Sequence, residues 1–230
     1  MKTFITTTLF IFYSGLSVFG QTDSTEFNKK QFHSYFGIQV PMLAELNNSL
    51  DANNYPKLSE NNFSVGLGMI QMTKKKIIFQ QELNVYSQTQ SNDTISTSLR
   101  SVSFGQSLFG YSYIQNENFQ MYSLFGLTYF NTTLKVTKAI NSGTTFNNYS
   151  STTGNQLEMT TNNFLANIST HFNYLIKLPN TKNRLILGVR AAYYLPFENS
   201  KWLMGKTELS GSPNINPGGY AFNFVLGFSY

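Results

Sequence analysis

Large apolar side chains alternate with small or polar ones along eight stretches of this chain. A period of two is typical of a β-strand that has one apolar face. The pattern is clearest in residues 219–230, where Tyr220, Phe222, Phe224, Leu226, Phe228 and Tyr230 are separated by small or polar residues. The other predicted strands cover residues 32–40, 62–72, 77–89, 99–112, 119–134, 162–178 and 184–197. Both faces of 119–134 are fairly apolar, so its phase stays open.

The segments between these strands alternate in length. They are long, short, medium, short, long, short and long, with the medium one at residues 90–98 and a long one at residues 135–161. An even number of strands places both termini and the short turns on one side and the longer loops on the other, as in outer-membrane barrels. A soluble barrel of lipocalin type would instead carry its apolar residues inside. We therefore predict an all-β, eight-stranded, antiparallel up-and-down transmembrane β-barrel.

The first long loop departs from the strand pattern. Leu43, Leu46 and Leu50 have helical spacing, and Tyr55, Pro56 and Leu58 follow them. This spacing predicts a short amphipathic helix and a turn. Two roles are open for this helix, packing over the mouth of the barrel and binding, and one role does not exclude the other.

The N-terminal segment predicts export. Lys2 precedes a mostly apolar stretch that ends at Gly20, which reads as a signal peptide of residues 1–20 rather than a membrane anchor, because Thr and Ser interrupt it. Residues 21–31 are polar and are expected to form a periplasmic lead-in, so the barrel itself covers residues 32–230.

Composition narrows the possible chemistry. Charged residues make up 12% and aromatic residues 16% of the chain, and cysteine is absent. Without cysteine there is no disulfide, thiolate metal site or thiol nucleophile. The net charge of +5 is scattered apart from Lys74 to Lys76, which does not form the concentrated basic face that nucleic acid requires. We expect no cofactor, no metal site and no nucleic-acid partner.

Two segments resemble a known class of proteins. The last strand, with Phe224, Leu226, Phe228 and Tyr230, resembles the C-terminal signal of bacterial outer-membrane barrels. The loop LNNSLDANNYPKLS, followed by a Gly-x-Gly strand, resembles small PorT-like and OmpA-type barrels of Bacteroidota. The resemblance implies an outer-membrane location, outer-membrane lipid around the barrel, and barrel-assembly machinery that reads the last strand.

The alternation also sorts polar residues into the lumen. An eight-stranded barrel is just wide enough to be filled by side chains, so we expect a polar plug and no diffusion pore. We expect Glu82 to neutralise Arg190, because buried charges are generally paired. The predicted plug comprises Glu82, Asn84, Tyr86, His171 and Arg190, and other inward polar residues are His33, Gln39, Asn173 and Tyr194.

Two glutamines fall on the predicted lipid face. If Thr89 pairs with Ser98, then Gln81 lies directly opposite Gln106. Since an unpaired amide in hydrocarbon costs several kcal/mol, we expect the two side chains to hydrogen-bond to each other.

Two classes of function remain open. The first is a structural or interaction barrel whose longer loops, rich in Asn, Ser, Thr and Tyr, contact a partner or surface ligand. The second is a lipid hydrolase or acyltransferase in which His33 or His171 is the base and a serine such as Ser169 is the nucleophile. No acidic residue is placed by sequence to orient either histidine, so the first class is preferred.

Overall fold

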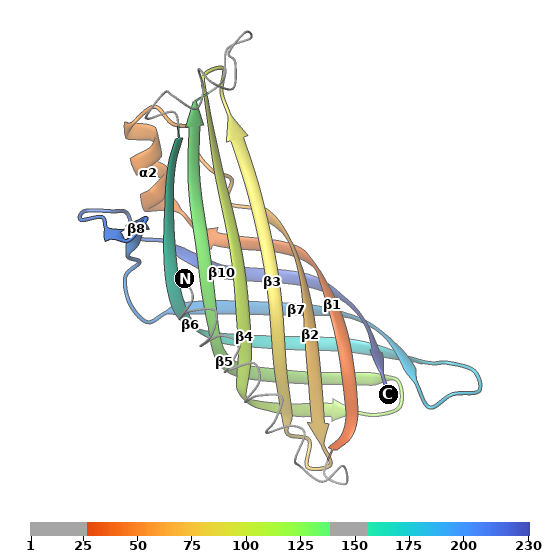
Figure 1. The fold of residues 1–230 in the computed structure, drawn as a ribbon. Coiled ribbons are helices and arrows are strands. Elements are labelled where there is room, and N and C mark those ends of the chain that lie inside the picture. The colour runs from red at the N-terminus through yellow and green to blue at the C-terminus, as the bar shows by residue number, and fades with distance from the viewer. Residues whose placement is uncertain (1–26, 139–155) are drawn as a thin grey trace.

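The computed structural model describes residues 27–138 and 156–230, and gives side-chain positions from residue 30 onward (Figure 1). The predicted signal peptide (residues 1–20) lies outside the described residues. So do most of the predicted lead-in (21–31) and the central part of the loop predicted for residues 135–161.

Eight long strands form a closed antiparallel ring. In order around the ring, they are β1 (Phe27–Met42), β2 (Asn62–Thr73), β3 (Ile78–Ser91), β4 (Ile95–Gln115), β5 (Phe119–Lys138), β6 (Gln156–Lys177), β7 (Arg184–Pro196) and β10 (Asn216–Ser229). The ring closes between β1 and β10, where Phe32 pairs with Phe228 and Val40 with Tyr220. The predicted up-and-down topology, and the pairing of the first strand with the last, are confirmed.

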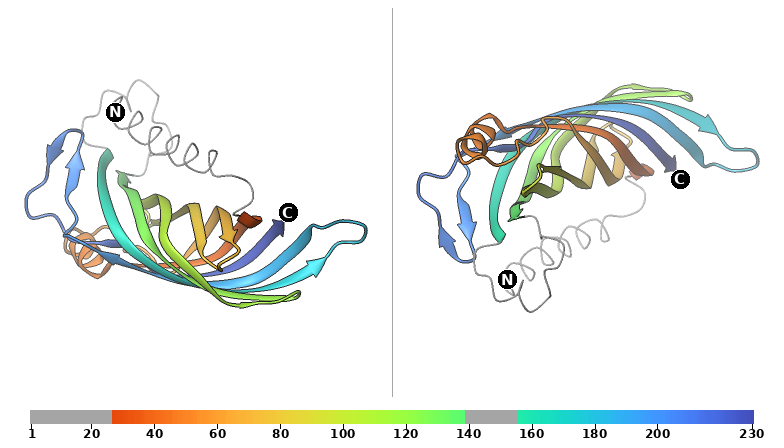
Figure 2. Two further views of the ribbon diagram at one scale, coloured as in Figure 1. Left: turned by 90° about the horizontal axis from the view of Figure 1, so that it is seen from below. Right: turned by 90° about the horizontal axis from the view of Figure 1, so that it is seen from above.

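Three smaller elements lie at the loop end of the barrel. They are α2 (Ala44–Ala52) and the hairpin of β8 (Trp202–Met204) and β9 (Thr207–Glu208), which pairs with β6 through Thr161 and Trp202. Figure 2 shows α2 and the hairpin at one end of the ring and the β6–β7 turn at the other. The helix is predicted by the leucine spacing, whereas the hairpin is not. Within the described residues, no helix has the length and apolar character needed to cross a membrane.

Several strands are longer than the alternation predicts. β1 begins at Phe27, within the predicted lead-in, and β4, β5 and β6 contain 21, 20 and 22 residues. The medium loop predicted for residues 90–98 is wrong, since β3 and β4 are joined by only Asn92–Thr94. The Asn92 side chain caps this turn by accepting hydrogen bonds from the amides of Thr94 (3.1 Å) and Ile95 (2.8 Å). Beyond the membrane a strand meets water on its outer face, so its ladder continues after the apolar alternation has stopped.

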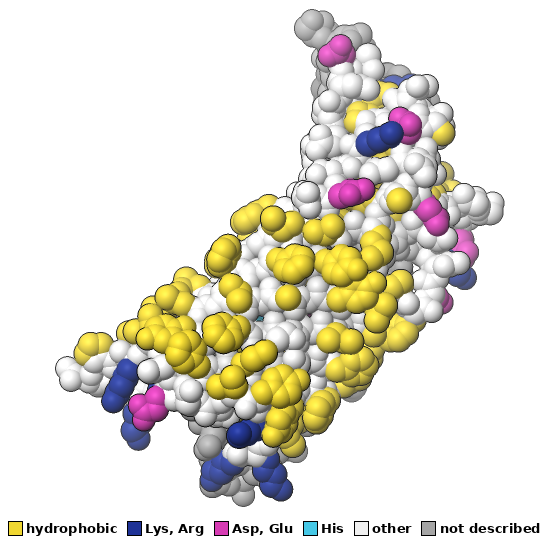
Figure 3. Space-filling view, turned by 180° about the vertical axis from the view of Figure 1, so that it is seen from behind, with side chains coloured by type: hydrophobic (Ala, Val, Ile, Leu, Met, Phe, Trp, Pro, Cys, Tyr) yellow, Lys and Arg dark blue, Asp and Glu magenta, His cyan; other side chains and the backbone are white. Residues whose placement is uncertain are grey.

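The exterior of the ring carries an apolar band. Phe63 is 67% exposed and Phe224 is 72% exposed, and Figure 3 shows hydrophobic side chains covering the lower part of the barrel wall. The inward positions of the same strands hold polar residues such as Gln80, Glu82 and Asn167. This arrangement is the reverse of a soluble lipocalin-type barrel and is that of a transmembrane barrel.

The structure also sets the phase of β5. Tyr122, Phe130 and Leu134 are buried inside the ring, while Phe125 and Leu127 are exposed on its wall. Both faces of β5 are apolar because its inner face contributes to two hydrophobic clusters inside the protein, one near each end of the strand.

Glycine makes room in the lumen at Gly68 on β2. A Cβ atom on Gly68 would lie 2.6 Å from Tyr35 Oη and 2.8 Å from Tyr35 Cε2. Because real Cβ atoms do not approach other atoms so closely, any other residue at position 68 would displace the Tyr35 ring from the lumen.

The predicted register of the two glutamines is confirmed, but their mutual hydrogen bond is not. Gln81 pairs directly with Gln106, and Thr89 with Ser98. Both glutamine side chains are half-buried on the outer face, and the structure, which describes both residues, contains no hydrogen bond between them. Each amide therefore reaches the lipid-facing wall without the predicted partner.

This gives a first prediction. Gln81→Leu should raise the free energy of unfolding by about 1 kcal/mol, because it replaces an amide on the lipid face with an apolar side chain. The measurement is urea-induced unfolding in phospholipid vesicles. Ser87→Leu, farther toward the loop end on the same face of β3, is the matched control and should change stability less. A Gln81→Leu protein less stable than the native one would contradict this prediction.

Candidate functional site

A buried ion pair crosses the lumen. Glu82 on β3 and Arg190 on β7 come from strands on opposite sides of the ring. Glu82 Oε2 and Arg190 Nη2 are 2.7 Å apart, and the two side chains are only 3% and 2% exposed. The pair therefore links two walls of the barrel through its centre.

Further side chains complete the environment of this pair. The Glu82 carboxylate accepts hydrogen bonds from Gln80 Nε2 (2.7 Å) and Tyr194 Oη (3.3 Å) as well as from Arg190. Arg190 Nη2 also donates to Tyr194 Oη (3.1 Å), and its Cζ lies 5.0 Å from the centroid of the Tyr35 ring. These partners offset part of the cost of removing both charges from water, while Arg190 Nε is buried without a hydrogen-bond partner.

The two histidines lie beside the ion pair. His171 is the direct partner of Arg190 in the β6–β7 ladder, and the Tyr35 ring that faces Arg190 also contacts both histidine rings. Their ring centroids are 6.3 Å apart and both rings are fully buried. His33 Nε2 lies 3.1 Å from Gln31 Oε1, and the His171 ring stacks on Tyr122 with centroids 4.5 Å apart and an interplanar angle of 15°. The histidine and tyrosine rings fill this part of the lumen with one stacked pair, His171 and Tyr122, and with tilted or edge-on contacts.

The geometry around His171 does not favour the hydrolase alternative. Ser169 Oγ lies 3.5 Å from His171 Nε2, but both residues are buried inside the lumen, away from the lipid-facing wall. His171 Nδ1 has no hydrogen-bond partner, so no acidic group orients the imidazole. A nucleophile of this kind needs an oriented base and access to its substrate, and the Ser169–His171 pair has neither.

Apolar clusters close the lumen on both sides of the polar residues. Toward the turns lies a cluster of Ile70, Met72, Ile78, Tyr122 and Leu124. The space left beside the Glu82–Arg190 pair is a cavity of about 10 Å³, which is room for one water molecule. Beside the ion pair, this space is too small for a small-molecule ligand.

The structure does not bring all the predicted plug residues together. Glu82 and Arg190 are in contact, and Tyr194 joins them. Asn84 is half-buried beside Gly66, and Tyr86 lies toward the loop end, where its hydroxyl donates to Pro217 O (2.8 Å). His171 is the direct partner of Arg190 in the β6–β7 ladder, and both contact the Tyr35 ring, so His171 lies with the ion pair while Asn84 and Tyr86 make other contacts.

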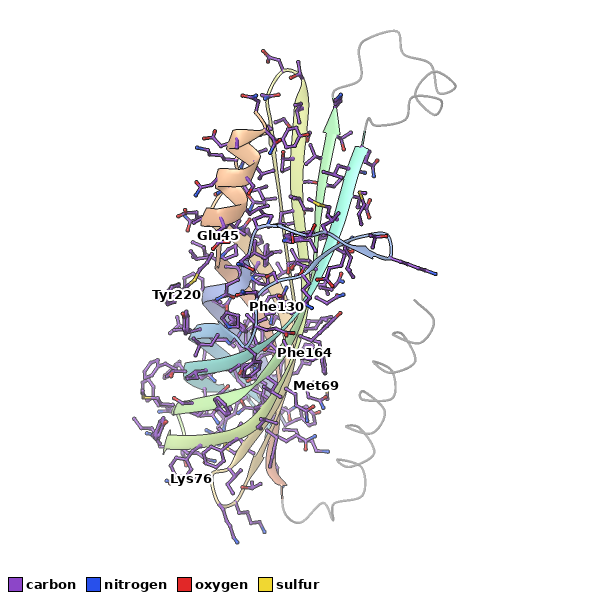
Figure 4. The ribbon with its side chains drawn as sticks, turned by 90° about the vertical axis from the view of Figure 1, so that its left-hand side faces the viewer. Glu45, Met69, Lys76, Phe130, Phe164 and Tyr220 are labelled. Atoms are coloured by element: carbon purple, nitrogen blue, oxygen red, sulfur yellow. The ribbon has the colours of Figure 1, made fainter. Side chains whose placement is uncertain are left out.

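At the loop end the protein has a second hydrophobic core. We call this core, together with the elements that enclose it, the head. It joins α2 and the β8–β9 hairpin to the loop ends of β4, β5 and β6. Figure 4 shows Glu45 on α2 and Phe130 on β5 in this upper half, with Lys76 at the opposite end of the barrel. The main buried residues of the head are Leu43, Leu46, Leu50, Leu58, Leu99, Phe130, Leu134, Leu165, Trp202 and Ile215.

Hydrogen bonds link the elements of the head. Asn47 on α2 exchanges two hydrogen bonds with the backbone of Leu58, at 2.9 and 3.0 Å. The Glu45 carboxylate accepts a bond from the amide of Asn214 (3.0 Å), and Trp202 Nε1 donates to Pro213 O (2.8 Å). The Glu45–Asn214 bond connects the first and last long loops, which are far apart in the sequence, whereas the other bonds lie within one loop each.

The sequence predicted only part of the hydrophobic core of the head. The leucine spacing of α2 predicted one apolar face, but it did not identify what covers that face. The signal that could have done so is the apolar inner face of β5, at Phe130, Leu134 and Val136, which continues past the residues needed to cross the membrane. Within residues 27–138 and 156–230, there is no group of three or more potential metal ligands.

Comparisons with known proteins find similar folds among solved structures. No protein-family model matches the chain, and no curated protein matches it either. Among solved structures, a major outer membrane protein from Thermus thermophilus has 10% identity and a TM-score of 0.52, over 88% of this chain and 98% of that chain. Ail, the attachment invasion locus protein of Yersinia pestis, has 10% identity and a TM-score of 0.47, over 88% and 97%. Neisserial surface protein A has 12% identity and a TM-score of 0.44, over 87% and 94%.

At such low identity a likeness establishes the fold alone. The Thermus protein supports the eight-stranded transmembrane barrel that the topology and the apolar exterior already show. Since closed barrels with an apolar outer band are typical of bacterial outer membranes, the predicted outer-membrane location agrees with the fold.

Proposed function

We propose that this barrel is an interaction protein that presents its head at the cell surface to a partner or surface ligand. The observation that carries the proposal is the hydrophobic core of the head. α2 and the β8–β9 hairpin are packed on strands that extend beyond the apolar band, although a barrel does not need these elements to close. Binding residues are commonly presented by loops on a rigid scaffold, and an ordered head lowers the entropy lost on binding.

The closed lumen supports the same proposal. The ion pair and the cluster of Ile70, Met72, Ile78, Tyr122 and Leu124 fill the interior, so transport through the described lumen is not supported. The buried Ser169–His171 pair lacks an orienting acid, so lipid modification is not supported either. The exposed surface of the head remains as the place where function is exerted.

The proposal also covers the predicted protein class, the surrounding lipid and the assembly signal. The chain belongs with small PorT-like barrels of Bacteroidota, on the basis of the loop at residues 46–59 and the last strand. Outer-membrane lipid surrounds the apolar band, and barrel-assembly machinery inserts the protein by reading Phe224, Leu226, Phe228 and Tyr230. These four side chains are all exposed on the outer wall, where such a signal is accessible.

Site-specific photo-crosslinking in intact cells tests the role of the head. A photoreactive residue at Glu60, Asp93 or Lys206, all exposed on the head, should give a discrete adduct, whereas one at Lys182 on the β6–β7 turn should not give it. Leu46→Ala should abolish the adduct, because the loss of a buried leucine costs about 2–5 kcal/mol and loosens α2.

The matched control is Asn48→Ala, which alters an exposed residue of the same helix and should leave the adduct unchanged. Gel mobility before and after heating verifies that each variant forms a barrel. An adduct that persists in Leu46→Ala, or one that forms only from Lys182, would show that the head is not the binding surface.

A further inference from the structure

Charge is distributed unevenly between the two ends of the barrel. Among the side chains that the structure describes, seven cations lie at the turn end, and we call them the basic rim: Lys30, Lys74 to Lys76, Lys177, Lys182 and Arg184. Glu117 is the one acidic side chain among the described residues of that end. The described loop end is balanced, with six Lys or Arg and seven Asp or Glu. Figure 3 shows basic side chains gathered along the lower edge of the apolar band.

The basic rim lies at the depth of lipid headgroups. Lys30 is two residues from the exposed Phe32, Lys177 follows the exposed Ile176, and Arg184 directly precedes Leu185 on the outer wall. With a rise of about 3.3 Å per residue, these cations are roughly 3–7 Å beyond the last apolar side chains of their strands. Phosphate groups occupy this zone in a bilayer, just outside the hydrocarbon.

The rim cations have no carboxylate partners. The three ion pairs of the described residues join Glu82 to Arg190 in the lumen, and Asp51 to Lys57 and Glu208 to Lys201 at the loop end. In the rim, the Arg184 side chain donates to the backbone carbonyl of Glu117, which leaves its charge uncompensated.

The β2–β3 turn holds its three lysines in a fixed arrangement. Lys76 N donates to Thr73 O (3.1 Å), and Ser112 N on β4 donates to Lys76 O (3.0 Å). Lys76 has a φ of 66°, in the left-handed region, which lets the backbone reverse within this short turn. All three side chains are exposed, and they project from a turn whose backbone is hydrogen-bonded to Thr73 and to Ser112.

We infer that the basic rim binds the phosphates of anionic phospholipids in the leaflet that surrounds the turn end. Lys and Arg next to a membrane surface are attracted to anionic lipid, by a factor of about five in affinity for each cation. The continuity of the rim with the apolar band favours lipid over a soluble partner. An acyl chain can lie against Phe32 or Ile176 while its headgroup meets the neighbouring cation. The exposed Tyr111, Tyr113 and Tyr174 provide the aromatic border expected at this depth.

Native mass spectrometry of the full chain in a neutral detergent tests the inference. Phosphatidylglycerol and phosphatidylcholine with identical acyl chains are titrated separately, and the bound lipids are counted. The native protein should bind phosphatidylglycerol at least roughly tenfold more tightly. The triple variant Lys74→Gln, Lys75→Gln, Lys76→Gln should lose between about tenfold and a hundredfold of that affinity. Added salt should reduce the preference, because the rim is exposed.

The matched control is the double variant Lys201→Gln, Lys206→Gln at the loop end, which should keep the native preference. Gel mobility before and after heating verifies that each variant is folded. Equal binding of the two lipids would overturn the inference, as would an unchanged preference in the triple variant. Displacement of the lipid by glycerol 1-phosphate alone would also overturn it, because the rim would then be a site for free phosphate.

Discussion

Glu82→Ala should lower the free energy of unfolding by about 3–5 kcal/mol, because it leaves the Arg190 guanidinium buried without its counter-charge. Arg190 is 2% exposed and lies between opposite walls of the ring, so water cannot easily replace the lost carboxylate. The measurement is urea-induced unfolding in phospholipid vesicles. It is followed by the fluorescence of Trp202, the only tryptophan of the chain, and by gel mobility.

Two variants serve as controls for this prediction. The double variant Glu82→Leu, Arg190→Leu should recover most of the lost stability, since replacing both charges removes the unpaired one. Lys201→Ala breaks an exposed ion pair of 3.8 Å and should cost less than about 1 kcal/mol. If Glu82→Ala were as stable as Lys201→Ala, the ion pair would not hold the lumen together.

Deletion of residues 228–230 should prevent assembly in the membrane, lowering the amount of folded barrel by more than about tenfold. Phe228 pairs with Phe32 on β1 and with Leu185 on β7, and Tyr230 exchanges backbone hydrogen bonds with Lys30 at 3.0 and 3.2 Å. Without these residues, backbone groups of β1 and β7 would face lipid unpaired. The measurement is the amount of heat-modifiable protein in isolated outer membranes.

Substitutions separate the two reasons for this loss. Phe228→Ala with Tyr230→Ala keeps the backbone ladder and removes the aromatic rings, so it tests recognition of the last strand alone. Leu185→Ala with Leu187→Ala changes the outward residues that pair with Phe228 and Leu226, and should still assemble. Normal assembly of the truncated chain would contradict the prediction.

The sequence by itself determined the strands that cross the membrane, their order, and the register of the hairpin that pairs Thr89 with Ser98. Each membrane-spanning residue faces either lipid or the lumen, so apolar and polar residues alternate along the strand with a period of two. The same contrast identified Glu82 and Arg190 as inward residues and set Gln81 opposite Gln106. Where both faces of a strand are apolar, as in β5, the pattern could not decide which face points inward.

The tertiary structure alone decided how the lumen and the head are packed. Glu82 meets Arg190 because β3 and β7 lie across the closed ring, a relation that depends on closure and not on sequence spacing. The Tyr86 side chain lies in the head and not in the polar plug, because its hydroxyl donates a hydrogen bond to Pro217 O. The head brings α2 onto Phe130 and Trp202, and the basic rim brings three separate stretches of chain to one edge. Contacts between distant segments carry no local period, so they become visible only when the ring has closed.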